Sequence, residues 1–500
     1  MKYKNPIIRG FNPDPSICRV GNDYYIVNSS FEFFPGIPVY HSKNLVNWQL
    51  LGYCLSRDSQ LELSGAKASS GIYAPTIRYN NGIFYVTATN VYHGGNFIVY
   101  SKDPSGRWSE PIWVDQNGID PSLFFDDDGT VYYSTTNNNK IMLSEINPLT
   151  GKRLSSIKQI SEGSGGRYPE GPHIYKINEW YYLMLAEGGT EYGHMETIFR
   201  SKSPWGPYEV CPHNPILTHR NKGENPIQCV GHADLVEDQN RNWWLVCLGV
   251  RPIGNLLLHN LGRETFLAPV IWDKNGWPIA GNNGTIAIEM DGPLLSEALP
   301  DENIFYDDFE NNKLDVHWNF IRNFNQARYD LSSKSSWLKI SGGEETLSES
   351  KGSPAFIGRK QQHFNCTVTT KILFDPIGDN SEAGIAAYYN DSYHYEVFIT
   401  KKNNDYYICL RKRIHDIEVI TDCVKIEYEG KLQLRIRSDR KYYYFDYKLS
   451  EDEWKTVGKG MTAGLCTEGT YLMTFTGTYI GIYCINGEAY FDWFEYFGED

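Results

Sequence analysis

The chain has 500 residues, of which 41% are hydrophobic and 22% charged, and its formal net charge at pH 7 is −14. This length exceeds what one hydrophobic core normally supports, so we expect two domains. The acidic balance would repel a phosphate backbone, which argues against nucleic acid as a partner. No stretch approaches the roughly 18 apolar residues of a membrane span, so no membrane partner is expected either.

The N-terminal sequence and the cysteines indicate the cellular compartment in which the protein is expected. The chain begins MKYKNPIIRGFNPDP, without the apolar core or cleavage site of a signal peptide, so we expect a cytoplasmic protein. The ten Cys residues include no Cys-x-x-Cys pair, and neither a disulfide framework nor a zinc site is expected. Four of them stand in apolar, strand-like contexts and are interpreted as buried thiols: Cys18, Cys229, Cys247 and Cys484.

Five segments share one pattern: a small or polar start, an apolar pair, a turn rich in Asn, Asp and Gly, and then adjacent aromatics in an apolar strand. This pattern is typical of a β-hairpin. The segments begin 46 to 62 residues apart, which suits one four-stranded blade each, and five blades form a β-propeller. A hairpin-rich sandwich is the alternative, but sandwiches seldom repeat at this period. The segments start at Asp14, Ala74, Asp120, Glu170 and His232.

A change in the sequence marks a second domain. After MDGPLLSEALPDE the chain continues at FYDDFENNKLDVHWNFIRN into strand-like stretches such as LQLRIRS and YYYFDYKL. Apolar and polar residues alternate there as in half-buried strands, and helical periodicity is nearly absent throughout. We therefore predict an all-β chain: a five-bladed propeller over residues 1–298, then a jelly-roll or concanavalin-like β-sandwich over residues 304–500.

The repeat pattern brings acidic residues together. The innermost strand of every blade faces the central channel, so equivalent positions point to one place. Asp14, Asp120, Glu170 and His232 are expected to converge there. Each Asp-Pro pair alone is compatible with an ordinary turn at a strand start. Together, the acids suit glycoside hydrolysis, in which one carboxylic acid protonates the leaving oxygen and one carboxylate about 6.5–9.5 Å away activates water. A third carboxylate would raise the pKa of the acid.

Longer motifs carry a family resemblance. They are NPDPSICRVGNDYYIVNSSFEFFPG, GIYAPTIRY, GIDPSLFFDDDG, YPEGPHIYK, GHADLVE and LGRETFLAPVIWDKNGWP, in this order, with FDWFEYF near the C-terminus. This set resembles glycoside hydrolase family 43, in its two-domain branch of β-xylosidases and α-L-arabinofuranosidases. The resemblance covers nearly the whole chain and implies a five-bladed propeller, an inverting mechanism and no required cofactor.

The resemblance also implies roles for single residues. Asp14 in NPDPS looks like the general base, Glu170 in PEGPH like the general acid, and Asp120 in GIDPS like the residue that tunes the pKa of the acid and orients it. His232 in GHADLVE is similar to a central histidine that holds a water molecule or a calcium ion in the channel. Arg263 in LGRET resembles an arginine that contacts the terminal sugar; a surface salt bridge is its alternative.

Two aromatic residues bear on the sugar. Phe31 in SSFEFFPG resembles an aromatic wall of the sugar site, and Tyr73 in GIYAPT stands where xylosidases of the family commonly have Trp. This departure, and the GVRP stretch at residues 249–252, favour α-L-arabinofuranose over β-D-xylose by a small margin. The expected substrates are arabinoxylo- or xylo-oligosaccharides, with a β-xylosidase proper as the alternative.

Other classes of function are less consistent with the sequence. A propeller lectin would repeat one pocket in every blade, whereas the inner positions differ here. A scaffold of the WD type needs Gly-His and Trp-Asp signatures at blade period, which are absent. An endo-acting arabinanase shares the propeller but generally lacks a large C-terminal sandwich.

We expect exo attack, with the sandwich packed near the channel mouth. A carbohydrate-binding module on a flexible tether is the alternative, but residues 297–301 contain little of the Gly or Ser that a flexible linker needs. The oligomeric state, including a homo-oligomer, stays open.

Overall fold

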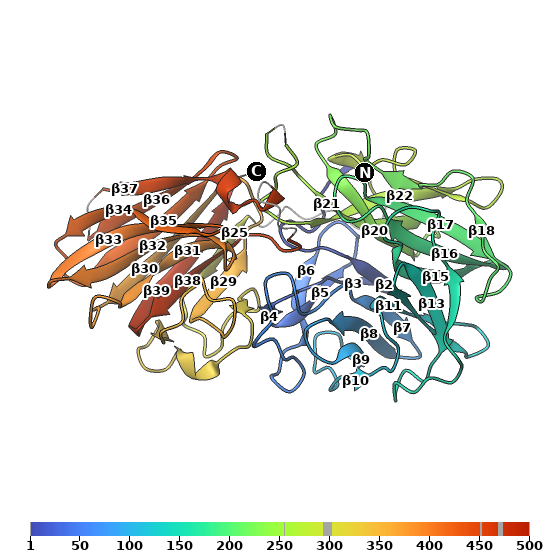
Figure 1. Cartoon of the computed structure of the whole chain (residues 1–500), viewed down its shortest axis with the longest axis horizontal. Coiled ribbons are helices and arrows are strands. Elements are labelled where there is room, and N and C mark those ends of the chain that lie inside the picture. The colour runs from blue at the N-terminus through green and yellow to red at the C-terminus, as the bar shows by residue number, and fades with distance from the viewer. Residues whose placement is uncertain (1, 255, 294–302, 451–452, 469–473, 500) are drawn as a thin grey trace.

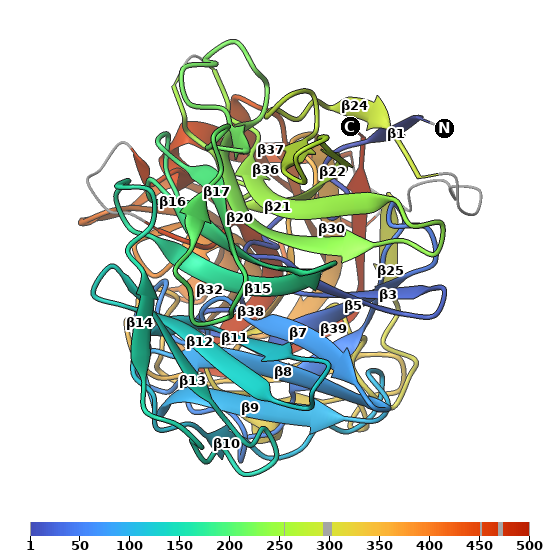
Figure 2. The same cartoon turned by 90° about the vertical axis from the view of Figure 1, so that its right-hand side faces the viewer.

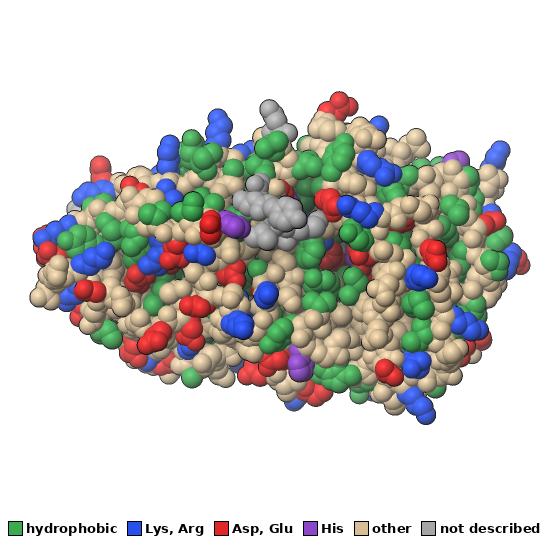
Figure 3. Space-filling model, in the orientation of Figure 1, with side chains coloured by type: hydrophobic (Ala, Val, Ile, Leu, Met, Phe, Trp, Pro, Cys, Tyr) green, Lys and Arg blue, Asp and Glu red, His purple; other side chains and the backbone are tan. Residues whose placement is uncertain are grey.

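The computed structural model describes residues 2–254, 256–293, 303–450, 453–468 and 474–499. In this part of the chain, strands dominate, and two short 3-10 turns, η1 (Gln326–Arg328) and η2 (Thr462–Leu465), are the only helical elements. Within the same residues, no helix has the length and apolar character needed to cross a membrane. Acidic and basic side chains are interspersed over the face drawn in Figure 3.

Each predicted repeat forms an antiparallel sheet whose strands follow in chain order, and the fourth sheet gains a fifth strand beside β17. The hairpins reverse tightly where residues take positive φ, as Asn81 (φ 50°) and Gly82 (φ 81°) do between β7 and β8. The strands are β2 (Ser16–Val20), β3 (Asp23–Val27), β5 (Gly36–Ser42) and β6 (Gln49–Leu55); β7 (Thr76–Asn80), β8 (Ile83–Asn90), β9 (Gly95–Ser101) and β10 (Ile112–Trp113); β11 (Ile119–Phe125), β12 (Val131–Asn137), β13 (Lys140–Glu145) and β14 (Lys158–Ser161); β15 (Glu170–Ile177), β16 (Trp180–Glu187), β17 (Met195–Ser201), β18 (Glu209–Val210) and β19 (Leu217–Thr218); β20 (Gln228–Glu237), β21 (Trp243–Val250), β22 (Glu264–Trp272) and β23 (Pro278–Ala280).

The five sheets close into a ring. The first strand of each sheet contacts the first strand of the next, from β2 through β7, β11 and β15 to β20, and β20 contacts β2 again. Figure 2 shows the sheets following one another from β8 at the bottom through β12 and β16 to β21 at the top. The N-terminal segment packs on the last sheet, since Ile8 bridges Thr265 of β22; β1 (Lys2–Lys4) and β24 (Glu289–Asp291) pair in a separate two-stranded sheet. The inner strands therefore surround one centre, as the repeat pattern predicts.

A buried carboxylate links four of the inner strands. Asp234 of β20 accepts hydrogen bonds from the Ser16 hydroxyl of β2 (2.6 Å), the Arg78 guanidinium of β7 (2.8 Å) and the Tyr175 hydroxyl of β15 (2.6 Å). Burial opposes ionisation of Asp234, but the charges of Arg78 and His173 and the hydrogen bonds from Arg78 and Ser16 together outweigh burial and lower the pKa to about 2. This ion pair with its hydrogen bonds joins sheets that are distant in sequence.

The second part of the chain folds into two larger sheets that share a core (Figure 1, orange to red). Its alternating burial, as in β35, matches the period-2 pattern of the sequence. One sheet contains β25 (Ile304–Asp307), β27 (Tyr329–Asp330), β28 (Leu338–Gly342), β30 (Cys366–Phe374), β35 (Leu432–Ser438), β36 (Tyr442–Leu449), β37 (Lys455–Met461) and β39 (Gly487–Gly498); the other contains β29 (Phe356–Lys360), β31 (Glu382–Asn390), β32 (Tyr393–Lys402), β33 (Asp405–Ile414), β34 (Ile417–Ile426) and β38 (Tyr479–Ile485).

The two parts pack directly on each other. Strand β26 (Phe320–Ile321) of the second part pairs with β4 (Phe33–Phe34) of the first. Nearby, the Arg322 guanidinium donates to the carbonyl of Ala66 (2.8 Å). This interface confirms the expected packing and excludes a module held only by a tether. The predicted end of the first domain, at residue 298, lies outside the described residues, and the second part begins with β25.

The cysteines differ from expectation at one pair. Cys18, Cys229, Cys247 and Cys484 are buried and free, as predicted. Cys409 and Cys423, however, form a disulfide that the sequence analysis did not predict. They stand directly opposite each other in the register of β33 and β34, with Cα atoms 4.2 Å apart. Only hairpin register brings them together, and their spacing of 14 residues matches no cysteine motif.

Candidate active site

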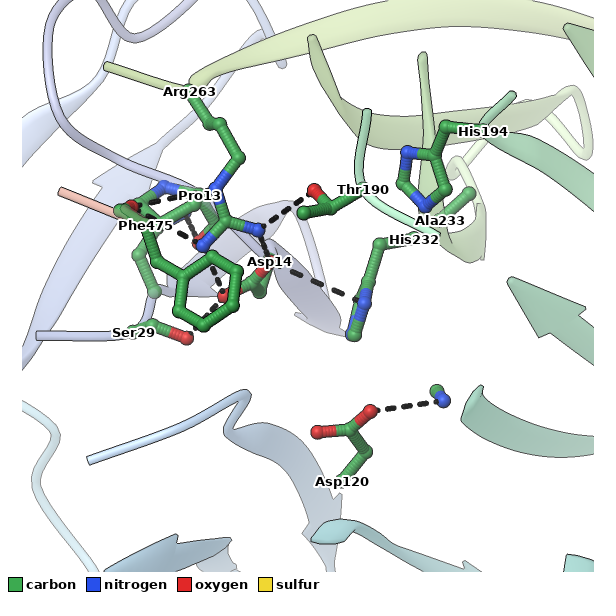
Figure 4. Close-up of polar contacts among 12 residues, drawn as sticks. Pro13, Asp14, Ser29, Asp120, Thr190, His194, His232, Ala233, Arg263 and Phe475 are labelled. Carbon is green, nitrogen blue, oxygen red and sulfur yellow. Dashed lines mark hydrogen bonds and ion pairs between the residues drawn. The ribbon is translucent and has the colours of Figure 1, made fainter. Parts of the chain in front are cut away.

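Asp14 lies just before β2 at the centre of the ring. Its backbone is in the left-handed region (φ 52°), and its side chain is 4% exposed. The carboxylate accepts hydrogen bonds from the Ser29 hydroxyl (2.5 Å) and from Arg263, with 2.8 Å from Nη1 to Oδ1. The His232 Nδ1 atom lies 4.0 Å from Oδ1 (Figure 4). Asp14 is thus anchored on one side and faces the middle of the ring.

The electrostatic surroundings keep Asp14 ionised. Burial alone would raise its pKa, but Arg263, His232 and the Ser29 hydroxyl together outweigh burial and lower the pKa below the usual range. An ionised carboxylate accepts protons, which is the property that a general base needs.

Arg263 connects three segments of the chain around Asp14. It stands directly before β22 and is 5% exposed, so the surface salt bridge considered from the sequence is wrong. Besides Asp14, its guanidinium donates to the Thr190 hydroxyl (3.1 Å) and to the backbone carbonyl of Phe475 (3.2 Å) (Figure 4). Phe475 belongs to the second part of the chain, so both parts build this site.

Asp120 lies across the centre from Asp14, in a bulge of β11 (Figure 4). It also has positive φ (51°), and its Oδ2 atom accepts from the Gly171 amide (3.2 Å). Burial, followed by the charges of Glu170 and Asp14, raises its pKa well above the usual range. Asp120 and Glu170 interact, so their protons belong to the pair.

Glu170 opens β15 and is only partly buried, in contrast to Asp14 and Asp120. Burial raises its pKa to about 7, with a second contribution from the charge of Asp14, whereas Arg263 acts in the opposite direction. Desolvation therefore raises the pKa of Glu170 more than repulsion by a neighbouring carboxylate does, whereas the sequence had suggested repulsion as the cause. A carboxyl group with this pKa is protonated in about half of the molecules at pH 7 and in most of them below it, so it can deliver a proton near neutral pH.

The predicted equivalence of Glu170 with the other inner residues is wrong by one position. Bulges interrupt the ladders after Ile119, after Glu170 and after Gly231, so Gly171 corresponds to Asp120 and His232. Gly171 shares their backbone conformation, with φ 57°. The repeat pattern in the sequence placed Glu170 at the position of Asp120. In the structure, the residues at equivalent positions are those with positive φ: Asp120, Gly171 and His232. Glu170 consequently stands one residue before the inner position.

His232 lies beside Asp14, as predicted. Burial lowers its pKa, so the imidazole is neutral at neutral pH. Calcium takes six to eight oxygen ligands, yet among the described residues no three His, Cys, Asp or Glu side chains converge as a metal site. A calcium ion held at His232 through water stays a prediction, and we assign no chemical step to a metal.

Three aromatic rings line one side of the site. Phe31 is 5.3 Å from Tyr73 and 5.7 Å from Phe475 between ring centroids, and Tyr73 is 5.9 Å from Phe475. The Arg263 guanidinium lies 5.6 Å from the Phe31 centroid. Burial raises the pKa of Tyr73 to about 12, so its hydroxyl stays protonated. The structure therefore brings Phe31, Tyr73 and Arg263 together beside Asp14, as the resemblance implied.

Sequence reasoning missed Ser29, Thr190 and Phe475. Ser29 and Thr190 stand within SSFEF and EGGTEYGH, which contain no catalytic pattern of their own. Phe475 is about two hundred residues beyond the propeller in sequence and reaches the site only because the domains pack together. No local signal separates these residues from ordinary strand and loop residues.

An ionised carboxylate and a protonated one, set beside aromatic rings at the centre of a ring of sheets, define a hydrolase of glycosidic bonds. The family model described as "Glycosyl hydrolases family 43" matches residues 3–278. A second family model, described as "Beta xylosidase C-terminal Concanavalin A-like domain", matches residues 306–497. The chain belongs to glycosyl hydrolase family 43 and is a glycosidase, with a β-propeller followed by a concanavalin-like sandwich. The predicted family resemblance is thereby confirmed.

Relatives resemble the chain over nearly its full length. The "Non-reducing end alpha-L-arabinofuranosidase BoGH43B" of Bacteroides ovatus is 43% identical and covers 99% of this chain and 94% of its own. The "Beta-xylosidase" of Bacillus subtilis is 34% identical, over 97% and 96% of the two chains. The solved structure "Bacteroides ovatus Xyloglucan PUL GH43B" has a TM-score of 0.96 at 42% identity and covers 100% of both chains.

Proposed function

We propose that this glycosidase is exo-acting and inverting, and that it removes terminal α-L-arabinofuranose from arabinoxylo-oligosaccharides. One observation carries the proposal. Asp14, held by Arg263 with a lowered pKa, shares a site with Glu170, whose pKa is raised to about 7. The site thus contains a base that is ionised and an acid that is protonated at the same pH, which is the pair that direct displacement by water requires.

The proposed reaction conserves its protons. Glu170 gives its proton to the glycosidic oxygen as the bond from this oxygen to the anomeric carbon breaks. A water molecule attacks the opposite face of that carbon, and Asp14 takes the proton that the water loses. The sugar leaves as a hemiacetal of inverted configuration. Solvent then reprotonates Glu170 and takes the proton from Asp14.

Asp120 and Arg263 act on this pair. Asp120 interacts with Glu170 and accepts from the amide of Gly171, so it orients the start of β15 and shares the proton of the pair. Arg263 holds Asp14 in its ionised form and presents a guanidinium beside Phe31 for the terminal sugar. The Nδ1 atom of His232 lies 4.0 Å from Asp14 Oδ1, so in this proposal its ring contacts the water molecule that Asp14 activates.

The sugar preference rests on similarity and on Tyr73. One relative is named an α-L-arabinofuranosidase and another a β-xylosidase, so both pentoses are within the range of this family. The identity to the arabinofuranosidase is higher, and Tyr73 replaces the Trp that is common in xylosidases. Hydrolysis of terminal β-D-xylose is the second candidate function, because the two pentoses need the same acid and base.

Exo attack follows from the part that the second domain takes in the site. Phe475 of the second domain packs against Phe31 and Tyr73, and in this proposal it closes one side of the site, so that a chain end enters rather than the middle of a polymer. We infer that the five sheets are the five blades of the propeller. We also infer that the chain has two domains, at residues 1–298 and 304–500. The cytoplasmic location stays a prediction, and the oligomeric state stays open.

Aryl glycosides and short oligosaccharides test the proposal. Nitrophenyl α-L-arabinofuranoside should give a higher kcat/KM than nitrophenyl β-D-xyloside, and arabinose should be the only sugar released from arabinosylated xylo-oligosaccharides. Arabinosylated xyloglucan oligosaccharides serve as a second natural panel. Faster release of xylose would favour the second candidate, whereas internal cleavage of intact arabinoxylan would contradict exo attack.

A further inference from the structure

Glu187 is a fully buried carboxylate at the end of β16, with a relative exposure of 0%. Its Oε1 atom accepts from the Ser164 amide (2.9 Å) and from the Thr197 hydroxyl (2.7 Å). Its Oε2 atom accepts from the Gly166 amide (3.0 Å) and from the Ser164 hydroxyl (3.1 Å). Four donors thus surround a side chain to which no reaction step has been assigned.

Three of the four donors come from residues 162–169, the segment that leads directly into Glu170. This segment lies mostly at the surface, whereas the carboxylate that holds it is buried. No described Lys, Arg or His side chain forms an ion pair with Glu187, so hydrogen bonds are the polar contacts that hold it. Four hydrogen bonds to one buried side chain, three of them from the segment, can restrain a surface segment.

Two glycines let the segment approach the carboxylate. A Cβ atom added to Gly166 would lie 2.5 Å from Glu187 Oε2, and one added to Gly163 would lie 3.0 Å from the same atom. The segment then holds Tyr168 at φ 53°, a conformation that costs free energy for a residue other than glycine. Such a backbone persists only where its surroundings enforce it, and Tyr168 stands two residues before Glu170.

Glu187 also begins the segment on the other side of the site. Its neighbour Ala186 pairs with Glu170 across β15 and β16. The next residue, Gly188, donates from its amide to the carbonyl of Arg167 (2.6 Å), and Thr190 beyond it accepts from Arg263. One buried carboxylate therefore ties the approach to the proposed acid to the loop that contacts the arginine of the proposed base.

We propose that Glu187 is a positioning residue for Glu170: it clamps residues 163–166 so that the proposed acid points at the leaving oxygen. The inference rests on the proposed role of Glu170. Glu187 touches neither substrate nor reacting atoms, and it acts only through the segment that it binds. A Glu187→Gln variant turns one acceptor into an amide donor, which then opposes the amide of Ser164 or of Gly166 and displaces the segment.

The test compares leaving groups. Because a misplaced acid matters only where the leaving oxygen needs a proton, Glu187→Gln should lower kcat/KM on a natural arabinoxylo-oligosaccharide about tenfold more than on a nitrophenyl arabinofuranoside. Gly166→Ala is the second variant, since it pushes the segment off the same carboxylate at a residue without positive φ and should change the ratio in the same direction. A purely structural role would lower both rates equally.

Two control variants lose hydrogen bonds that do not involve the segment at residues 162–169. Thr197→Val removes a donor from Glu187 on the side of β17 and leaves the segment's contacts in place. Asp238→Asn alters another buried carboxylate, which holds the tip of the β20–β21 hairpin through the amides of Asn240 and Asn242. Both should lower the melting temperature without changing the leaving-group ratio.

The outcomes separate the two proposals. The decisive quantity is the ratio of kcat/KM on the natural oligosaccharide to kcat/KM on the nitrophenyl arabinofuranoside. If this ratio stayed unchanged in Glu187→Gln and Gly166→Ala, or fell equally in Asp238→Asn, the positioning role would be overturned. If Glu170→Gln itself showed no dependence on the leaving group, the proposed function would fail instead. If Glu187→Gln did not fold, Gly166→Ala alone would decide.

Discussion

Gly171 lies against the imidazole of His232: a Cβ atom on Gly171 would be 3.1 Å from Nε2 and 3.2 Å from Cε1. Gly171 also has φ 57°, a conformation that favours glycine. The histidine of one sheet thus occupies the space that a side chain would need on the neighbouring sheet. A side chain at residue 171 would therefore collide with His232, whereas Glu170 stands one residue before this position.

Gly171→Ala should therefore impair both stability and activity. The left-handed backbone alone costs roughly 1–2 kcal/mol for alanine, and the added methyl group pushes on His232 beside Asp14. Gly21→Ala is the matched control, because Gly21 has φ 64° and open space around its Cβ position. Thermal unfolding should show a loss in both variants, and kcat/KM should fall only in Gly171→Ala. Equal activity in the two would contradict the role of this contact.

The two proposed catalytic carboxylates should respond differently to neutral replacement. Glu170→Gln removes the proton donor, so hydrolysis of natural oligosaccharides should fall about 100- to 10,000-fold, and that of activated aryl glycosides much less. Asp14→Asn should slow both substrates equally, since both need activated water. Initial rates on the two substrate types measure this. Similar losses for both substrates in Glu170→Gln would reassign its role.

Activity should depend on pH through the same two groups. Glu170, with a pKa of about 7, keeps its proton below that pH and loses it above, so kcat/KM should fall as the pH rises through 7. Asp14, with its lowered pKa, should stay ionised until the pH falls below the usual range of an aspartate. A pH–rate profile of kcat/KM checks both limbs. Tyr73→Phe serves as the control and should leave the alkaline limb in place, because the pKa of Tyr73 is about 12.

The configuration of the released sugar reports the mechanism directly. Water that attacks while the leaving group departs must invert the anomeric carbon. Proton NMR of a fresh reaction should show the inverted anomer first, before mutarotation. A retained anomer would mean that a carboxylate attacks carbon, and it would contradict the assignment of Asp14 as a base.

Phe475 should contribute mainly to substrate binding. Phe475→Ala removes the ring that faces Phe31 and Tyr73 but keeps the backbone carbonyl that accepts from Arg263. We expect KM for arabinosides to rise about tenfold, which corresponds to about 1.4 kcal/mol of lost binding, with a smaller change in kcat. Phe497→Ala, at an exposed residue of β39, is the control and should keep KM. An unchanged KM in Phe475→Ala would separate the second domain from the sugar site.

Much of the fold and part of the site could be predicted from short stretches of sequence. Hairpin signatures, the two-residue alternation and the spacing of repeats depend on neighbouring residues, so five sheets and a second β domain were visible without coordinates. Repeats also carry position: Asp14, Asp120 and His232 could be placed at one centre because identical local geometry recurs around a ring. The family motifs then indicated Arg263, Phe31 and Tyr73.

Tertiary structure alone decided the remaining features. The one-residue shift that puts Gly171 at the inner position comes from the bulge in β15, and Gly171 packs against His232 of another sheet. Phe475 enters the site through domain packing, and Cys409 meets Cys423 through strand register. The contacts of Gly171 with His232 and of Phe475 with Tyr73 join segments far apart in sequence and are set by how sheets and domains pack, whereas Cys409 and Cys423 meet through the register of a single hairpin. The sequence by itself determined which groups could do chemistry, whereas packing decided how far each is buried and therefore which carboxyl group keeps its proton.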